Sequence, residues 1–114
     1  FEDWFGIEVD KDANGCLQDI HWSMGAFGYF PTYTLGNLYA AQLLKTMSKQ
    51  LGDIDTLIES GNWSGIGGWL RENIHQKGLQ SSAAELIEEI TGSVPSPEPF
   101  LNYVEDKYSR LYEL

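Results

Sequence analysis

The sequence has 114 residues, a length that fits one folding unit with a single modest core. Hydrophobic residues make up 42% of the chain and aromatic residues 13%, which indicates a globular protein rather than a disordered one. Seventeen acidic residues against seven basic ones give a formal charge of −10, so we expect neither a nucleic-acid partner nor docking on an anionic membrane.

Cys16 is the only cysteine, so no intramolecular disulfide can form and a cytoplasmic location is favoured. We expect Cys16 itself to be a small buried apolar residue. No apolar run approaches the roughly 18 residues of a transmembrane helix, and no signal peptide opens the chain. The first residue is Phe1 rather than an initiator Met, so we expect a processed product or a piece of a longer protein.

The first part of the chain, residues 1–34, is rich in glycine and aromatic residues and has no sustained helical period. We predict it to be mostly irregular. The one stretch that could alternate as a strand is 5–9.

From Leu35 onward the apolar residues recur at helical spacing, which predicts five helices in 35–114. The first runs over 35–51 and stops at Gly52, and the second is short, over 53–60. The remaining three are predicted from Trp63 toward Gly78, from a capping box of Ser82 with Glu85 to Gly92, and over 100–111 behind Pro99.

Short connections between amphipathic helices imply that neighbouring helices pack antiparallel. We therefore predict an all-α fold in one domain, 1–114, with an irregular aromatic-rich segment followed by about five antiparallel-packed helices.

The residue types argue against a self-contained catalytic centre. A zinc site needs three or four converging ligands, and Cys16, His21 and His75 are the only His or Cys residues. Neither H-E-x-x-H nor C-x-x-C occurs, so we expect no metal to be bound by this chain. No Gly-x-Ser-x-Gly elbow occurs either, which disfavours a nucleophilic triad.

The unusual region combines polar and aromatic groups outside the predicted helices. It comprises Gln18, Asp19, His21 and Trp22, followed by the aromatic run 27–33. If 19–21 is extended, Asp19 and His21 share a face and point into one cavity, whereas on a helix they diverge. The alternative from residue types alone is that Asp19 caps a turn and that His21 and the aromatics belong to the core.

The pattern Gly15-x-x-Gln18-Asp19-x-His21-Trp22 resembles the G-x-x-Q-D-x-H-W signature of carboxypeptidase Taq metallopeptidases. All five fixed positions match. The likeness continues through Ser23, Gly25 and 27–37, and more loosely through Trp69-Leu70, Ile74-His75, Lys107-Tyr108 and Leu111-Tyr112.

The resemblance implies a larger helical metallopeptidase, often dimeric, that removes C-terminal residues from peptides with a free terminal carboxylate. It also implies zinc or cobalt, held by the two His of H-E-x-x-H and a downstream Glu. Because this chain has none of those ligands, we expect it to be the C-terminal part of such an enzyme, inactive alone, whose partner is the missing N-terminal portion.

Within that picture residues 1–34 form an active-site wall, and His21, oriented by Asp19, donates a hydrogen bond to the substrate carboxylate or the developing oxyanion. Tyr33, or with slightly less preference Tyr29, stabilises the tetrahedral intermediate. Gln18 binds the substrate backbone and Trp22 walls the pocket.

Two alternatives stay open at the level of sequence. One is a non-catalytic helical interaction module derived from the same family. The other is a small helical protein that binds an aromatic or sugar ligand through Trp22, Tyr29 and Tyr33.

Overall fold

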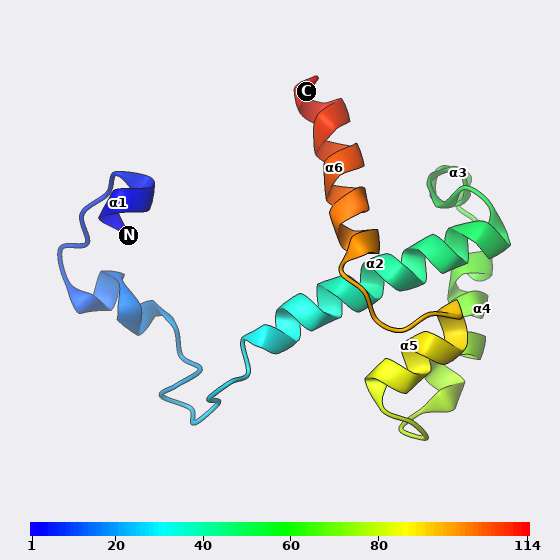
Figure 1. Ribbon diagram of the computed structural model, residues 1–114, viewed down its shortest axis with the longest axis horizontal. Helices are drawn as coiled ribbons and strands as arrows, with labels where there is room; N and C mark the ends of the chain where they lie inside the picture. The colour runs from blue at the N-terminus through cyan, green and yellow to red at the C-terminus, as the bar shows by residue number, and fades with distance from the viewer. The chain divides into compact units, whose positions relative to one another are not determined.

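The computed structural model describes residues 1–114 and contains only helices, turns and irregular segments (Figure 1). This confirms the all-α class. The stretch 5–9 is not a strand, because Phe5 ends a short helix and Gly6 turns the chain with a left-handed backbone, φ 64°. The chain divides into two units, Phe1–Tyr33 and Thr34–Leu114. This division into units does not test the prediction of a single domain over 1–114, which stays a prediction.

The first unit consists of short helical turns joined by loops. It contains α1, Glu2–Phe5, and two 3-10 helices, η1, Asp12–Asn14, and η2, Cys16–Gln18. All but one of its side-chain hydrogen bonds join residues no more than five positions apart. No residue of this unit is buried, and Cys16 is exposed, so the expectation of a buried Cys16 was wrong. A segment of this length is too short to enclose a core of its own.

The five predicted helices are all present, with α2 beginning earlier than expected. They are α2, Pro31–Leu51, α3, Ile54–Glu59, α4, Trp63–Asn73, α5, Ala83–Thr91, and α6, Glu98–Tyr112. Helix α2 begins at Pro31, four residues before the predicted start. Proline suits a first helical position because its missing N–H would be unpaired there in any case.

Local capping signals fix the ends of the shorter helices. Asp53 accepts a hydrogen bond from the Asp55 backbone N–H at the start of α3. The predicted capping box of Ser82 and Glu85 opens α5, and Gly92 closes it with a left-handed backbone, φ 74°. Helix α4 ends at Asn73 rather than near Gly78, and a 3-10 helix, η3, His75–Lys77, follows it.

The core of the second unit is small. Its buried hydrophobic residues are Met47, Trp69 and Ile87. Two polar contacts tie α2 to later parts of the chain: the Trp69 indole N–H donates to Gln50 at 2.6 Å, and the buried Gln42 amide binds the α5–α6 connection. These contacts hold α4 and the end of α5 against α2 (Figure 1).

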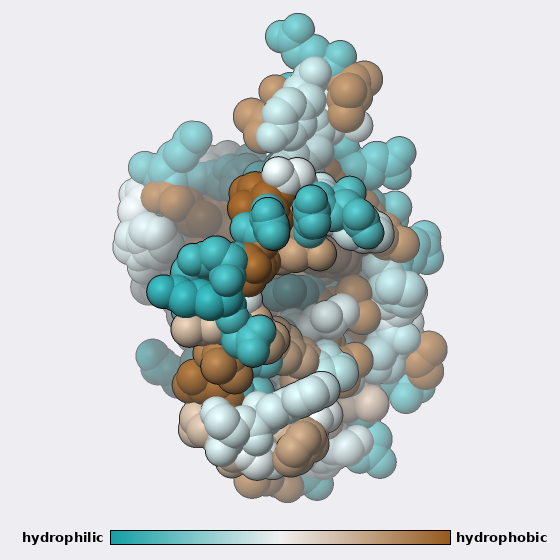
Figure 2. Space-filling view, turned by 90° about the vertical axis from the view of Figure 1, so that its left-hand side faces the viewer, coloured by the Kyte–Doolittle hydropathy of each residue, from teal (hydrophilic) through white to brown (hydrophobic).

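Large hydrophobic side chains are exposed on both units. Apolar residues lie open among hydrophilic ones on the face shown in Figure 2. Residues 1–33 carry more than half of the exposed large hydrophobics, although they are less than a third of the chain. No helix is both long enough and apolar enough to span a lipid bilayer.

Candidate active-site wall

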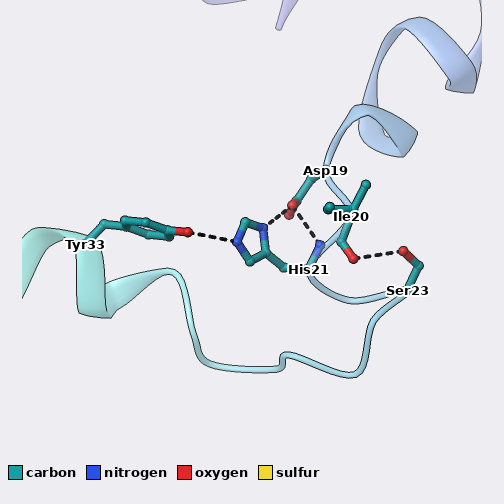
Figure 3. Close-up of polar contacts among 5 residues, drawn as sticks. All are labelled: Asp19, Ile20, His21, Ser23 and Tyr33. Carbon is teal, nitrogen blue, oxygen red and sulfur yellow. Dashed lines mark hydrogen bonds and ion pairs between the residues drawn. The ribbon is translucent and has the colours of Figure 1, made fainter.

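The candidate site is built on the loop that follows η2. Asp19 has an extended backbone, φ −88° and ψ 124°, and His21 begins a turn. The expected condition of an extended 19–21 stretch is therefore met at Asp19 only, yet the two side chains do meet. One Asp19 carboxylate oxygen accepts the His21 backbone N–H at 3.0 Å and also contacts His21 Nδ1 (Figure 3). The carboxylate therefore holds both the backbone and the ring of the histidine.

A tight loop returns the chain from His21 to Tyr33. Gly25 and Gly28 have φ of 76° and 74°, left-handed conformations that glycine adopts without strain. The Ala26 backbone N–H donates to the His21 carbonyl at 2.8 Å, which closes the first turn of this loop. Tyr33 then lies in the first turn of α2, and its hydroxyl points at the imidazole (Figure 3).

Tyr33 completes a chain of three polar side chains. Its Oη lies 3.3 Å from His21 Nε2. Because an ionised carboxylate only accepts hydrogen bonds, we assign the Nδ1 proton of His21 to the contact with Asp19. In the neutral imidazole, Nε2 is then an acceptor for the Tyr33 hydroxyl, and in the imidazolium it becomes a donor.

The electrostatics of Asp19 favour its charged form. Hydrogen bonds from the His21 backbone N–H, and then from the imidazole, lower the pKa of the Asp19 carboxyl below its ordinary value. Asp19 thus stays ionised when the solution is acidic enough to protonate an ordinary aspartate. An ionised partner fixes the tautomer and orientation of the ring.

Aromatic rings surround the imidazole. The Tyr29 ring stacks on it with centroids 5.6 Å apart, and the Phe30 ring lies 4.6 Å away. Tyr29 and Tyr33 meet edge to face at 5.4 Å. The His21 side chain is consequently 23% exposed, although it lies in a unit with no buried residue. The aromatic rings therefore shield the imidazole from water better than most side chains of this exposed unit are shielded.

Two of the predicted site residues lie apart from this cluster. The Gln18 amide donates to the Ala13 carbonyl, and Gln18 lines a different cavity near Gly15 and Cys16. Trp22 packs on Phe27, with centroids 5.8 Å apart, and stays 69% exposed. The structure thus brings together Asp19, His21, Tyr29 and Tyr33 and leaves Gln18 and Trp22 outside the group.

Four residues beside the site were not singled out from the sequence. Phe30 contacts the imidazole, while Ile20, Met24 and Ala26 line a cavity with His21 and the two tyrosines. Phe30 lies within the aromatic run 27–33, which the sequence analysis included in the unusual region without assigning Phe30 a role. The three aliphatic residues could not be predicted, because apolar side chains in an irregular segment cannot be told from ordinary packing residues.

No three His, Cys, Asp or Glu residues cluster closely enough to hold a metal ion. His21 and Asp19 supply at most two donors, and Asp19 is already engaged by His21. Protein metal sites of the zinc type need at least three. The residues present therefore do not fit a metal centre.

The model of the carboxypeptidase Taq (M32) metallopeptidase family matches residues 1–108. This chain belongs to that family. Carboxypeptidase Taq relatives include thermostable carboxypeptidase 1 of Thermus thermophilus, 42% identical over 112 residues and 98% of this chain, and carboxypeptidase 1 of Bacillus subtilis, 41% identical over all 114. The chain spans 22% and 23% of the lengths of these two relatives.

Solved structures of carboxypeptidase Taq enzymes share the fold. The M32 carboxypeptidase of Deinococcus radiodurans R1 is 34% identical and superposes with a TM-score of 0.88, covering 99% of this chain and 23% of that one. Metallocarboxypeptidase 1 of Trypanosoma cruzi gives a TM-score of 0.83 at 39% identity, covering 94% and 23%. Family membership confirms the sequence resemblance.

Proposed function

We propose that this chain is the C-terminal part of a metal-dependent carboxypeptidase that hydrolyses the last peptide bond of peptides. The observation that carries the proposal is the convergence of Asp19, His21 and Tyr33 in a chain of the family. His21 and Tyr33, which can both donate hydrogen bonds, face each other beside a cavity, and the Asp19 carboxylate orients the His21 ring. Such a pair suits an anionic oxygen of the substrate.

His21 is the group that we assign to the substrate carboxylate or to the oxyanion that develops at the scissile carbonyl. In its protonated form the His21 ring donates from Nε2 while Nδ1–H stays on Asp19. The Asp19 carboxylate keeps the ring in place. Asp19 is thus a positioning residue and His21 the residue that touches substrate.

Tyr33 is the tyrosine that we assign to the same anionic oxygen. At 3.3 Å its contact with His21 Nε2 is a long hydrogen bond, so little is lost when the hydroxyl turns to a substrate oxygen. Tyr29 stacks on the imidazole and offers a second phenol. Neither Gln18 nor Trp22 has a contact that supports a role at this centre.

The family implies a metal, and we propose zinc or cobalt held by an H-E-x-x-H segment outside these 114 residues. When bound, such an ion polarises a carbonyl and activates water. The residues of this chain supply the opposite wall, which binds and orients the substrate.

The partner that we propose is the remaining N-terminal portion of the same polypeptide. The chain spans about a fifth of its relatives' length, and many of its large apolar side chains are open to solvent. Monomers seldom leave large apolar patches uncovered. The homodimer implied by the resemblance remains a prediction.

We also propose that the protein is cytoplasmic, where thiols stay reduced. The single cysteine, Cys16, is a free and exposed thiol. Secreted proteins more often pair their cysteines. Fractionation of cells with an antibody to this chain would test the location, and recovery from the extracellular medium would contradict it.

The activity test uses the longer polypeptide that carries this sequence, loaded with zinc or cobalt. We expect it to release the terminal residue from a blocked dipeptide with a free carboxylate and not from the same dipeptide with a C-terminal amide. The isolated 114-residue chain should release nothing. Absence of H-E-x-x-H upstream of Phe1, or equal cleavage of the amide, would overturn the proposal.

A further inference from the structure

Phe30 contacts both of the side chains that we assign to the anionic oxygen of the substrate. Its ring centroid lies 4.6 Å from that of the His21 imidazole and 5.9 Å from that of the Tyr33 ring. Both distances fall in the range of about 4.5–7 Å at which aromatic rings attract each other. The Phe30 backbone carbonyl also accepts a hydrogen bond from the Tyr33 backbone N–H at 3.1 Å.

The backbone around Phe30 is restricted by the residue that follows it. Pro31 opens α2, and the proline ring fixes the first φ of the helix. A residue before proline is largely excluded from the helical backbone region. The Phe30 ring is therefore attached to a constrained backbone, two residues before the helical turn that carries Tyr33.

The contact between His21 and Tyr33 has little other support. Asp19 holds the Nδ1 side of the imidazole, whereas His21 Nε2 and the Tyr33 hydroxyl have no hydrogen-bond partner in this chain except each other. Their distance of 3.3 Å joins residues twelve positions apart. Because one long hydrogen bond fixes a distance poorly, the packing of the neighbouring rings has to fix it.

Tyr29 also packs on both rings, with centroids 5.6 Å from His21 and 5.4 Å from Tyr33. Its hydroxyl can itself donate to a substrate, so a Tyr29 variant changes chemistry and packing together. Phe30 has the shortest centroid distance to the imidazole among the three rings and no polar side-chain atom. Phe30 thus acts only through its neighbours.

We propose that Phe30 is a positioning residue, whose ring sets the separation of His21 Nε2 and the Tyr33 hydroxyl and keeps both directed at one substrate oxygen. The inference rests on the proposed function. Groups that stabilise a developing charge have to be in place before the reaction, within about 0.5 Å of the productive geometry. Phe30 supplies that precision in a loop that has no buried residue.

The experiment measures kcat/KM of the metal-loaded longer polypeptide on a blocked dipeptide with a free terminal carboxylate. Phe30→Leu keeps an apolar side chain and removes the flat ring. Because a misplacement of about 1 Å can cost about 100-fold in rate, we expect this milder change to lower kcat/KM by about 10-fold. Phe30→Tyr keeps the ring and should recover most of that loss.

Phe27→Leu is the matched control, since it makes the same substitution in the same loop. The Phe27 ring packs on Trp22 and not on the imidazole. This variant should keep kcat/KM close to the wild-type value. Thermal unfolding of each variant shows whether folded proteins are being compared, and Phe30→Met replaces Phe30→Leu if the latter does not fold.

A double-mutant cycle distinguishes positioning from general packing. Tyr33→Phe removes the hydroxyl and keeps the ring that Phe30 contacts. If Phe30 directs that hydroxyl, Phe30→Leu should lower kcat/KM by only about 3-fold or less in the Tyr33→Phe background, because residues that act on one interaction are not additive.

The outcomes separate this inference from the proposed function. An equal loss from Phe30→Leu in both backgrounds, or a Phe30→Leu enzyme as active as Phe27→Leu, overturns the inference and leaves the carboxypeptidase assignment intact. A wild-type enzyme that releases no terminal residue from the dipeptide overturns the proposed function and the inference with it.

Discussion

The two units of this chain differ in what holds them together. Thr34–Leu114 has a small buried core of Met47, Trp69 and Ile87 and a buried amide that ties α2 to the α5–α6 connection. Phe1–Tyr33 has no buried residue and depends on turns and local hydrogen bonds, yet it carries the whole candidate site. Chemistry and stability are thus assigned to different parts of the sequence.

This separation predicts that substitutions in the two units change different measured quantities. Changes at the site should reduce kcat/KM and leave unfolding nearly unaffected, because exposed side chains contribute little to stability. Changes in the second unit should lower the free energy of unfolding and leave kcat/KM unchanged while the protein stays folded.

The largest effect is expected for His21→Ala in the longer, metal-loaded polypeptide. Removing one preorganised hydrogen-bond donor to a developing oxyanion typically costs about 100- to 1,000-fold in kcat. His75→Ala is the matched control, because His75 is exposed and lies in the second unit. Unchanged kcat and KM for His21→Ala would exclude a catalytic role for this histidine.

Asp19→Asn should have the next largest effect. It removes the charge that holds the His21 ring, and loss of such a supporting partner typically costs about 10- to 100-fold in activity. Asp12→Asn makes the same chemical change at an exposed residue outside the site. Because His21 lowers the pKa of Asp19, the wild-type enzyme should show no loss from Asp19 protonation until the pH falls below about 3.9.

If Asp19 instead acts only as a turn cap, its substitution would lower stability rather than kcat. Thermal unfolding of Asp19→Asn, recorded beside its kinetics, distinguishes the two roles. A kcat/KM equal to that of the Asp12→Asn control would remove Asp19 from the site.

In the second unit, Gln42→Leu tests the buried amide. Gln42 is 4% exposed, and its side chain has four hydrogen-bond partners: Thr91 at the end of α5, and Ser93, Val94 and Ser96 on the α5–α6 connection. Leaving such groups unpaired costs about 1–3 kcal/mol. Hydrogen exchange should report faster opening around α5 and the start of α6, with kcat/KM unchanged. A large loss of activity in a folded variant would contradict the conclusion that the second unit contributes stability and not chemistry.

The smallest effect is expected at the capping box of α5. The Ser82 hydroxyl, and then its backbone N–H, lower the pKa of Glu85. The folded state therefore binds this proton less readily than the unfolded state. The ionised Glu85 carboxylate adds its full stabilisation of the fold above the ordinary pKa near 4.3, and this stabilisation is lost as the pH falls through the lower pKa of the folded state. Ser82→Ala should cost about 1 kcal/mol, the usual cost of removing an N-cap side chain.

Hydrogen exchange of α5 across pH 5 to 3 would measure the titration. Glu85→Gln is the matched variant, because it keeps the side-chain shape and removes the ionisation. Equal pH dependence in the wild type and in Glu85→Gln would show that the box does not contribute through the charge of Glu85.

Much of the second unit was predictable from the sequence, because its signals act over a few residues. Apolar spacing located the five helices, and Ser82, Glu85 and Gly92 marked the bounds of α5. Pro31 was missed as the start of α2, since the aromatic run before Leu35 hid the helical period. The early end of α4 was also missed, because Ile74 continues the apolar period although its backbone leaves the helix.

The candidate site was only partly predictable. The signature from Gly15 to Trp22 indicated the family and singled out Asp19 and His21, but it also assigned substrate contacts to Gln18 and Trp22, which lie outside the cluster. The cavity wall of Ile20, Met24 and Ala26 had no sequence signal.

The sequence by itself determined the helices, their caps and the family signature, because each depends on residues within a few positions of one another or on identity at fixed spacing. Only the tertiary structure decided that Tyr33 meets His21 across twelve positions and that the Asp19 carboxylate contacts the His21 ring. Those facts depend on left-handed turns at Gly25 and Gly28 and on packed aromatic rings, which no local pattern specifies.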